Sequence, residues 1–308
     1  MQPEIDINQD AADLHKAMKG LGTDEAAIIK IIANRTNQQW QLIKNSFNKQ
    51  FNRDLIKDLK SELSGKFEDT VLALFMEPIE YDCHSLRHAM KGLGTDEDTL
   101  IEILCSRPNW YIQQTHKKYR EMYNRELVMD LMDELSGNLR KVILAIVQGA
   151  RSENLSPNQD VCRKKAEDLF KAGENRLGTD ESVFYKILTE NSPPEIACIA
   201  MEYQKISKNS LLTAIDKEFS GDMKKVLQTI VYVIINPSEY FATRVNKAIK
   251  GWGTNEKLLS RILITRDEID MPQIKEAYKK LYNKDMVEAI KSDTSGDYKK
   301  LLVELCSH

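Results

Sequence analysis

The chain has 308 residues, of which 42% are hydrophobic and 30% charged, and its net charge is −3 at pH 7. This composition is ordinary for a soluble globular protein, and the slight negative charge argues against a nucleic-acid partner, which usually selects a basic face. The longest apolar stretch, around residues 226–235, is far shorter than the roughly 20 residues that span a bilayer.

The start of the chain and its cysteines suggest where the protein works. Residues 1–10 contain neither the basic nor the apolar segment of a secretory signal, so we expect a short head without a signal peptide. The five cysteines are an odd number and show no CxxC spacing. Reduced thiols in a cytoplasmic protein are therefore expected, with no transmembrane segment.

A nine-residue sequence, AMKGLGTDE, occurs twice, at residues 17–25 and 89–97. Looser copies follow at residues 173–181 (GENRLGTDE) and 249–256 (IKGWGTNE). A second marker, an acid shortly before a Ser-Gly pair, lies 40 residues after the last loop glycine in every copy. The four acids are Glu62, Glu134, Glu218 and Asp293. A glycine loop and a distant acid in a fixed register predict four copies of one ion site.

The spacing of these markers divides the chain into a head and four repeats. We expect the head at residues 1–10, followed by repeat 1 at 11–78, repeat 2 at 79–150, repeat 3 at 161–236 and repeat 4 at 237–308. The remaining residues, 151–160, are polar and contain a proline. They predict a linker between two pairs of repeats.

Apolar residues recur with helical spacing inside each repeat. In repeat 1, Leu55, Leu59 and Leu63 lie four residues apart and end beside the acid. The equivalent stripes in the other repeats are Leu127, Leu131 and Leu135, then Leu211, Ile215 and Phe219, then Met286 and Ile290. Alternating strand patterns are absent. We expect an all-α fold with about five helices per repeat, roughly twenty in all, that pack through these apolar faces.

The first loop and its acid suit calcium. Gly20 and Gly22 allow the backbone to turn carbonyl oxygens toward one point, and hard cations such as Ca²⁺ prefer oxygen ligands. Glu62 is predicted at the end of a helix, where its charge opposes the helix dipole unless a cation compensates it. The carbonyls of Met18, Gly20 and Gly22 with two oxygens of Glu62 would supply about five of the 6 to 8 ligands that Ca²⁺ takes.

The unfilled positions and the remaining positive charge predict what the site meets. A phosphate of an anionic lipid would complete the coordination shell, so the ion would join a net-negative protein to an acidic membrane. The alternative is an ordinary helix–turn–helix connection that binds no ion. No EF-hand loop is present.

The residue between the loop glycines is apolar in every copy, and a basic residue stands nearby. The apolar residues are Leu21, Leu93, Leu177 and Trp252, and the basic residues are Lys19, Lys91, Arg176 and Lys250. Apolar side chains at an exposed tip favour a bilayer interface, and basic side chains meet lipid phosphates. The alternative is that these tips pack against neighbouring helices.

These motifs resemble those of the annexins, which have four repeats of about seventy residues, each with a K-G-x-G-T loop and an acid about forty residues on. The resemblance covers nearly the whole chain, and residues 293–300 (DTSGDYKK) are also similar to annexin C-termini. It implies a curved all-α disc with its calcium loops on the convex face. It also implies reversible, calcium-dependent binding to membranes rich in phosphatidylserine.

The resemblance also implies the ligands of the other sites. The second site would use the carbonyls of Met90, Gly92 and Gly94 with Glu134. The third would use Gly173, Arg176 and Gly178 with Glu218, and the fourth Ile249, Gly251 and Gly253 with Asp293. Weaker sites beside the loops would involve Glu25, Glu97, Glu181 or Glu256. The arginine that closes the second helix in many annexins is matched by Arg35, Arg107 and Arg266, whereas repeat 3 has Asn191 there.

No sequence pattern indicates catalysis. The motifs GxSxG, HExxH, GxGxxG and the P-loop are absent, and His84 and His88 lack an evident third metal ligand. We therefore expect a membrane-binding protein and no enzyme. The alternatives are calcium-regulated ion conduction, the aggregation of membranes, and a hydrolase or nucleotide-binding enzyme that calcium only stabilises. Self-association into trimers or lattices on membranes is left open.

Overall fold

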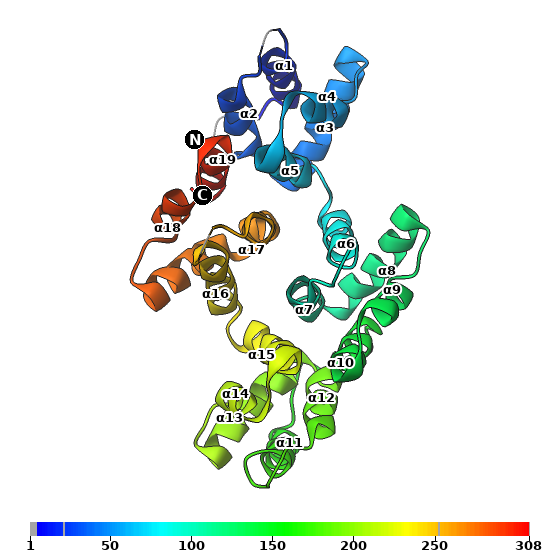
Figure 1. The fold of residues 1–308 in the computed structure, drawn as a ribbon, viewed down its shortest axis with the longest axis vertical. Helices are drawn as coiled ribbons and strands as arrows, with labels where there is room; N and C mark the ends of the chain where they lie inside the picture. Colours follow the sequence, from blue (N-terminus) through cyan, green and yellow to red (C-terminus); the bar gives the residue numbers. More distant parts are fainter. Residues whose placement is uncertain (1–4, 21, 252, 308) are drawn as a thin grey trace. The chain divides into compact units, whose positions relative to one another are not determined.

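The computed structural model describes residues 5–20, 22–251 and 253–307 as an assembly of α-helices (Figure 1). These residues form nineteen helices and no strand, which confirms the all-α prediction. The long helix α17 (Glu256–Tyr282) contains a non-helical residue, Asp270, just before Pro272, so it consists of two helices that meet at a kink. With α17 counted as two, each of the four repeats has five helical segments.

The helices follow one another in the same order in each repeat. Repeat 1 contains α1 (Ile7–Ala17), α2 (Glu25–Ile32), α3 (Asn37–Phe51), α4 (Leu55–Glu62) and α5 (Gly65–Leu74). Repeat 2 contains α6 (Pro78–Ala89), α7 (Glu97–Cys105), α8 (Asn109–Tyr123), α9 (Leu127–Glu134) and α10 (Gly137–Val147). Repeat 3 contains α11 (Gln159–Ala172), α12 (Glu181–Glu190), α13 (Pro193–Ser207), α14 (Leu211–Glu218) and α15 (Gly221–Ile235). Repeat 4 contains α16 (Pro237–Ile249), α17, α18 (Met286–Asp293) and α19 (Gly296–Leu305).

Polar residues fix where several of these helices begin and end. Thr36 and Gln39 form a capping box at the start of α3, and Ser192 does the same with Glu195 at α13. Such boxes satisfy N–H groups that have no partner within the helix. At its other end α3 stops at Asn52, whose φ of 50° is left-handed and cannot continue the helix.

The apolar stripes that the sequence predicts form the core. Leu55, Leu59 and Leu63 on and after α4 are buried, and their counterparts in the other three repeats are buried as well. In repeats 1 to 3 the stripe ends at the residue after the acid, and in repeat 4 the buried Thr294 takes that place, so packing of this short helix fixes the position of the acid.

The repeats group into two compact units. Unit 1 comprises the described residues up to Tyr81 and from Phe241 onward, and unit 2 comprises Asp82–Tyr240. In unit 1, α19 packs against α2 and α5 (Figure 1). In unit 2, α15 packs against α7, and α10 packs against α12. Unit 1 therefore combines repeats 1 and 4, and unit 2 combines repeats 2 and 3.

This grouping differs from the consecutive pairs suggested by the polar linker. Residues 151–158 are non-helical, as expected of a linker, but they lie inside unit 2. Asn109 of α8 donates hydrogen bonds to the carbonyl of Arg151, at 2.7 Å, and to the side chain of Glu153, at 3.1 Å. The polar composition reflects these hydrogen bonds and exposure to water, and does not separate the repeats on either side.

Candidate functional site

Each glycine loop connects the first and second helices of its repeat. Loop 1 spans residues 18–24, loop 2 spans 90–96, loop 3 spans 173–180 and loop 4 spans 250–255. One backbone hydrogen bond of 2.7–2.9 Å closes every loop, from the last loop residue to the end of the first helix: Asp24 to Ala17, Asp96 to Ala89, Asp180 to Ala172 and Asn255 to Ala248. The side chain of the same last residue also caps the second helix.

Loop 2 shows why glycine is needed at two of these positions. Gly92 has a φ of 118° and Gly94 a φ of 86°, in the region that other residues rarely adopt. Both glycines are exposed. In the described part of the chain, no group donates a hydrogen bond to the carbonyl of Met90, Gly92 or Gly94. The three carbonyl oxygens that the sequence predicts as ligands of a hard cation therefore accept no hydrogen bond within the described part of the protein.

The structure brings each acid to its loop through a threonine. The hydroxyl of Thr23 donates to Glu62 at 2.9 Å, and that of Thr95 donates to Glu134 at 2.9 Å. Thr179 donates to Glu218 in the same way, and Thr254 donates to Asp293 at 2.6 Å. Threonine and the residue after it are both cap types, and in each loop the cap is the aspartate or asparagine that follows the threonine. The threonine at a constant place in every loop was the available signal.

Each acid is the last residue of a short helix, namely α4, α9, α14 or α18. Glu62 and Glu134 are exposed, whereas Glu218 and Asp293 are half-buried. A carboxylate at this end faces the negative pole of the helix dipole, which destabilises it by a few tenths to about 1 kcal/mol. The loop hydroxyl offsets part of this cost, and a bound cation would offset more.

The oxygen donors of the loops fit calcium, and the described residues offer no cluster of side chains as a different metal site. Within the described ranges, His, Cys, Asp and Glu side chains form no group of three or more that could hold a metal ion. The ring centroids of His84 and His88 are 6.5 Å apart, but among the described residues these two histidines do not belong to a group of three possible metal ligands. An ion at these loops would therefore be held by backbone oxygens with one acid, which suits Ca²⁺ better than Zn²⁺.

Loop 3 differs from the others in its backbone and in its anchoring. The carbonyl of Gly173 accepts a hydrogen bond of 3.0 Å from the N–H of Arg176. Gly173 is buried, and a Cβ there would lie 3.3 Å from Cγ of Glu218, so this glycine permits the acid to approach the loop. The Gly173 oxygen therefore has one of its two lone pairs occupied, unlike the loop 2 oxygens.

Glu174 ties loop 3 to the end of α13. Its carboxylate accepts hydrogen bonds from Tyr203 at 2.8 Å, Ser207 at 2.5 Å and Asn209 at 2.6 Å, and it lies 4.0 Å from Lys217. Burial raises the pKa of Glu174, but these hydrogen bonds outweigh burial and lower the pKa below its ordinary value. Loop 3 is thus held by an ionised side chain of its own.

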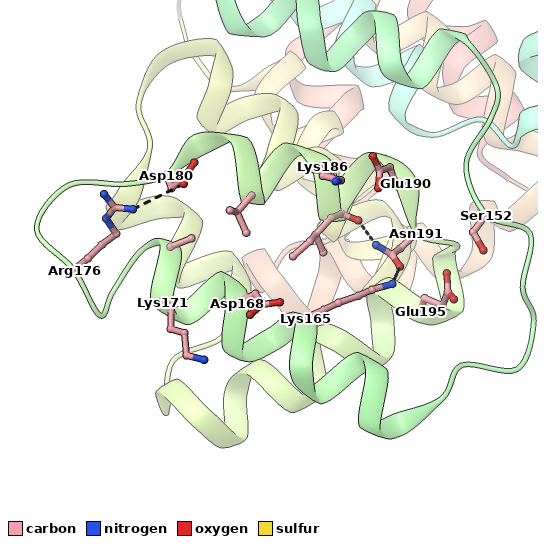
Figure 2. Close-up of a pocket in the computed structure, with 13 residues that line it drawn as sticks. Ser152, Lys165, Asp168, Lys171, Arg176, Asp180, Lys186, Glu190, Asn191 and Glu195 are labelled. Atoms are coloured by element: carbon pink, nitrogen blue, oxygen red, sulfur yellow. Dashed lines mark hydrogen bonds and ion pairs between the residues drawn. The ribbon is translucent and has the colours of Figure 1, made fainter.

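Repeat 3 also lacks the ion pair that joins the first and second helices of repeats 1 and 2. Arg35 bonds to Asp10, and Arg107 to Asp82, each at 2.7 Å. In repeat 3 the Lys165 ammonium donates instead to the side chain of Asn191, as Figure 2 shows.

A cavity of about 690 Å³ lies beside this pair, between α11 and α12. It extends to Arg176 and Asp180, which are 3.9 Å apart in loop 3. A cavity of about 1090 Å³ also lies beside the Arg35–Asp10 pair of repeat 1, so the replaced pair, and not the cavity, distinguishes repeat 3.

The loop tips are open to solvent where the structure describes them. Leu93 and Leu177 are 109% and 102% exposed, so neither packs against a neighbouring helix. Lys19, Lys91, Arg176 and Lys250 are exposed as well. Leu21 and Trp252, the tips predicted for loops 1 and 4, lie outside the described residues.

Two of the acids implied in weaker sites have protein partners. Glu256 accepts a hydrogen bond from Lys66 of α5. Glu181 accepts one of 2.6 Å from Asn138 of α10. Both contacts join the start of a second helix in one repeat to the start of a last helix in the other repeat of the same unit. A weaker site at either position would compete with that contact.

Comparisons with known proteins agree with this architecture. A family model described as Annexin matches residues 9–74, 81–146, 164–230 and 240–305. Human annexin A7 is 45% identical over 301 residues, which are 98% of this chain and 62% of annexin A7. The chain thus spans less than two thirds of that relative.

Solved structures are similar over the whole chain. The structure of annexin III matches with a TM-score of 0.94 and 39% identity, and the match covers 99% of this chain and 95% of that one. The calcium-bound structure of annexin (Sm)1 matches with a TM-score of 0.88 and 32% identity, over 98% of this chain and 90% of that one. In the described part of the chain, no helix is long and apolar enough to cross a bilayer.

Proposed function

Because the chain belongs to the annexin family, we propose that it binds membranes containing anionic phospholipid, such as phosphatidylserine, reversibly and only in the presence of calcium. Calcium-dependent phospholipid binding is the general property of this family. The observation that carries the proposal is the meeting of loop and acid, through a threonine, in all four repeats. The function is binding at the membrane surface and not catalysis.

Each loop would hold one ion with three carbonyl oxygens and one acid. The proposed sets are Met18, Gly20, Gly22 and Glu62; Met90, Gly92, Gly94 and Glu134; Gly173, Arg176, Gly178 and Glu218; and Ile249, Gly251, Gly253 and Asp293. A bound Ca²⁺ supplies positive charge and open coordination positions for phosphate oxygens. Calcium affinity should therefore be weak in water and stronger at a lipid surface.

The residues around each ion would add two further contacts with lipid. Lys19, Lys91, Arg176 and Lys250 are exposed and would meet phosphate groups. The exposed tips Leu93 and Leu177 would enter the interface, which removes their apolar surface from water. We propose the same role for Leu21 and Trp252.

Changing Leu93 to aspartate should weaken calcium-dependent vesicle binding about tenfold or more, since burial of a leucine side chain is worth about 1.5–3 kcal/mol. The control is Leu155→Asp, which changes a side chain that is 82% exposed in the linker and adds the same charge. Vesicle titration at fixed calcium measures both. Equal binding by the two variants would mean that the tip stays outside the bilayer.

The proposal is tested by co-sedimentation with vesicles. The full chain is mixed with vesicles of phosphatidylserine and phosphatidylcholine, or of phosphatidylcholine alone, with calcium or with a chelator. Sedimentation only with calcium and acidic lipid, and release by chelator, is the expected result. A protein that stays in the supernatant at millimolar calcium would overturn the proposal.

A further inference from the structure

The threonine–acid hydrogen bond joins two side chains in the same way in all four loops. The two residues are 39 positions apart in every repeat, although the loops themselves differ in sequence and length. In the described part of the chain, the threonine is also the sole hydrogen-bond donor to each of these four carboxylates. Because this hydrogen bond is the same in four loops of different sequence, we expect the threonine to have the same function in each loop.

Helix capping does not explain this threonine. In loop 2, the side chain of Asp96 accepts from the N–H of Thr99 and so caps α7, and Thr95 precedes this cap. The other three loops have the same arrangement, with Asp24, Asp180 or Asn255 as the cap. The threonine hydroxyl is therefore free to bind the acid residue, and at Thr254 it contacts both the carboxylate and the backbone carbonyl of Asp293, at 2.6 Å and 2.8 Å.

The carboxylates need such a partner because packing alone does not fix them: two are exposed and two are half-buried. Glu134 is exposed at the end of α9, where an unrestrained glutamate side chain samples many rotamers and points into water. A hydrogen bond from Thr95 to one oxygen holds the carboxylate beside loop 2. An ionised carboxylate has about four lone-pair sites, so one hydroxyl leaves both oxygens able to bind a cation.

We propose that Thr23, Thr95, Thr179 and Thr254 are positioning residues, whose hydroxyls hold the four site acids against their loops before the ion arrives. This inference rests on the proposed calcium sites. Outer partners that orient a metal ligand typically contribute 10–100-fold to metal affinity. The hydroxyl here lowers the loss of side-chain freedom on ion binding, and it does so without touching the ion.

The test compares two sets of variants of the full chain. In one set all four threonines become valine, which keeps the shape and removes the hydroxyl. In the other set all four become serine, which keeps the hydroxyl. The calcium midpoint for sedimentation with phosphatidylserine–phosphatidylcholine vesicles is measured for each set. Thermal unfolding in chelator is measured alongside, because a threonine that only stabilised the fold would change the unfolding temperature instead.

We expect the valine set to raise the calcium midpoint about tenfold. The serine set should recover most of the loss, and the unfolding temperatures in chelator should agree. A pairwise cycle makes the claim specific to the acid: once Glu134→Gln is present, adding Thr95→Val should not change the midpoint further.

Three outcomes would overturn the inference. An unchanged midpoint in the valine set, with the wild type still bound, would remove the hydroxyl from the mechanism and leave the proposed function intact. A full effect of Thr95→Val on top of Glu134→Gln would assign the threonine a role that does not act through the acid. Failure of the wild type itself to sediment at millimolar calcium would remove the proposed function and this inference together.

Discussion

Calcium-dependent vesicle binding should disappear when Glu62, Glu134 and Glu218 become glutamine and Asp293 becomes asparagine. The substitutions keep the size and shape of each side chain and remove the one negative charge that each loop contributes. Since ligand charge sets calcium affinity over several decades, we expect the calcium midpoint to rise by at least about 100-fold. Co-sedimentation with phosphatidylserine vesicles over a calcium series measures it.

A matched control separates the ion sites from overall charge. Asp69→Asn, Glu121→Gln, Glu190→Gln and Glu276→Gln change four exposed acids that belong to none of the four sites. Both sets raise the net charge by four, so both strengthen long-range attraction to an acidic membrane equally. The control should keep its calcium dependence. Calcium-dependent binding by the site variant at the wild-type midpoint would show that the acids are not ligands.

The second large effect concerns folding. Asp82 is fully buried in α6, and its carboxylate binds the guanidinium of Arg107 at 2.7 Å and 3.2 Å. Burial lowers the pKa of Arg107, but the neighbouring Asp82 outweighs it and raises that pKa above its ordinary value. Asp82→Ala leaves the arginine charge buried without its partner. We expect a loss of about 3–5 kcal/mol in the free energy of unfolding, measured by urea denaturation in chelator.

Two further variants test the cause of this loss. Asp82→Ala combined with Arg107→Ala removes both charges and should recover part of the stability, because no unpaired charge remains. Asp133→Ala removes an exposed acid of α9 and should change stability by no more than about 0.5 kcal/mol. If the double variant were as unstable as the sum of its parts, the loss would come from packing and not from the unpaired charge.

The helices and the register of the loops could be predicted because they depend on neighbours in the sequence. Leu55, Leu59 and Leu63 mark a buried helix face through spacing alone, and the repeated loop fixes where the chain turns. The number of repeats follows from the same self-similarity. These features need no knowledge of which repeat packs against which.

The pairing of repeats and the role of the loop threonine could not be predicted in this way. Repeats 1 and 4 meet through side chains far apart in sequence, such as Thr70 and Ser260, whereas the polar linker at 151–160 suggested consecutive pairs. Thr95 and Asp96 are both good capping residues by type, and only their directions in space assign the cap to Asp96.

The departure in repeat 3 was visible in the sequence, but its consequence was not. Asn191 stands where the other repeats have an arginine, which predicts altered packing without saying what replaces the ion pair. Lys165 stands at the position equivalent to Asp10 and Asp82, seven residues before the end of the first helix of its repeat, so a lysine–asparagine hydrogen bond replaces the aspartate–arginine ion pair. The reach of a lysine across two helices depends on backbone separation, which a sequence does not give.

The division into two units bears on how the chain acquires its structure. Unit 2 is one uninterrupted stretch, Asp82–Tyr240, so its contacts can form as soon as that stretch exists. Unit 1 needs both flanks of the chain, and contacts such as Lys66 with Glu256 join residues 190 positions apart. Closing a segment of that length costs about 1.4 kcal/mol more in chain entropy than closing the 39-residue segment of a single loop and acid. During synthesis, the residues of repeat 1 must therefore wait until most of the chain has been made, and unit 2 can complete its core while they wait.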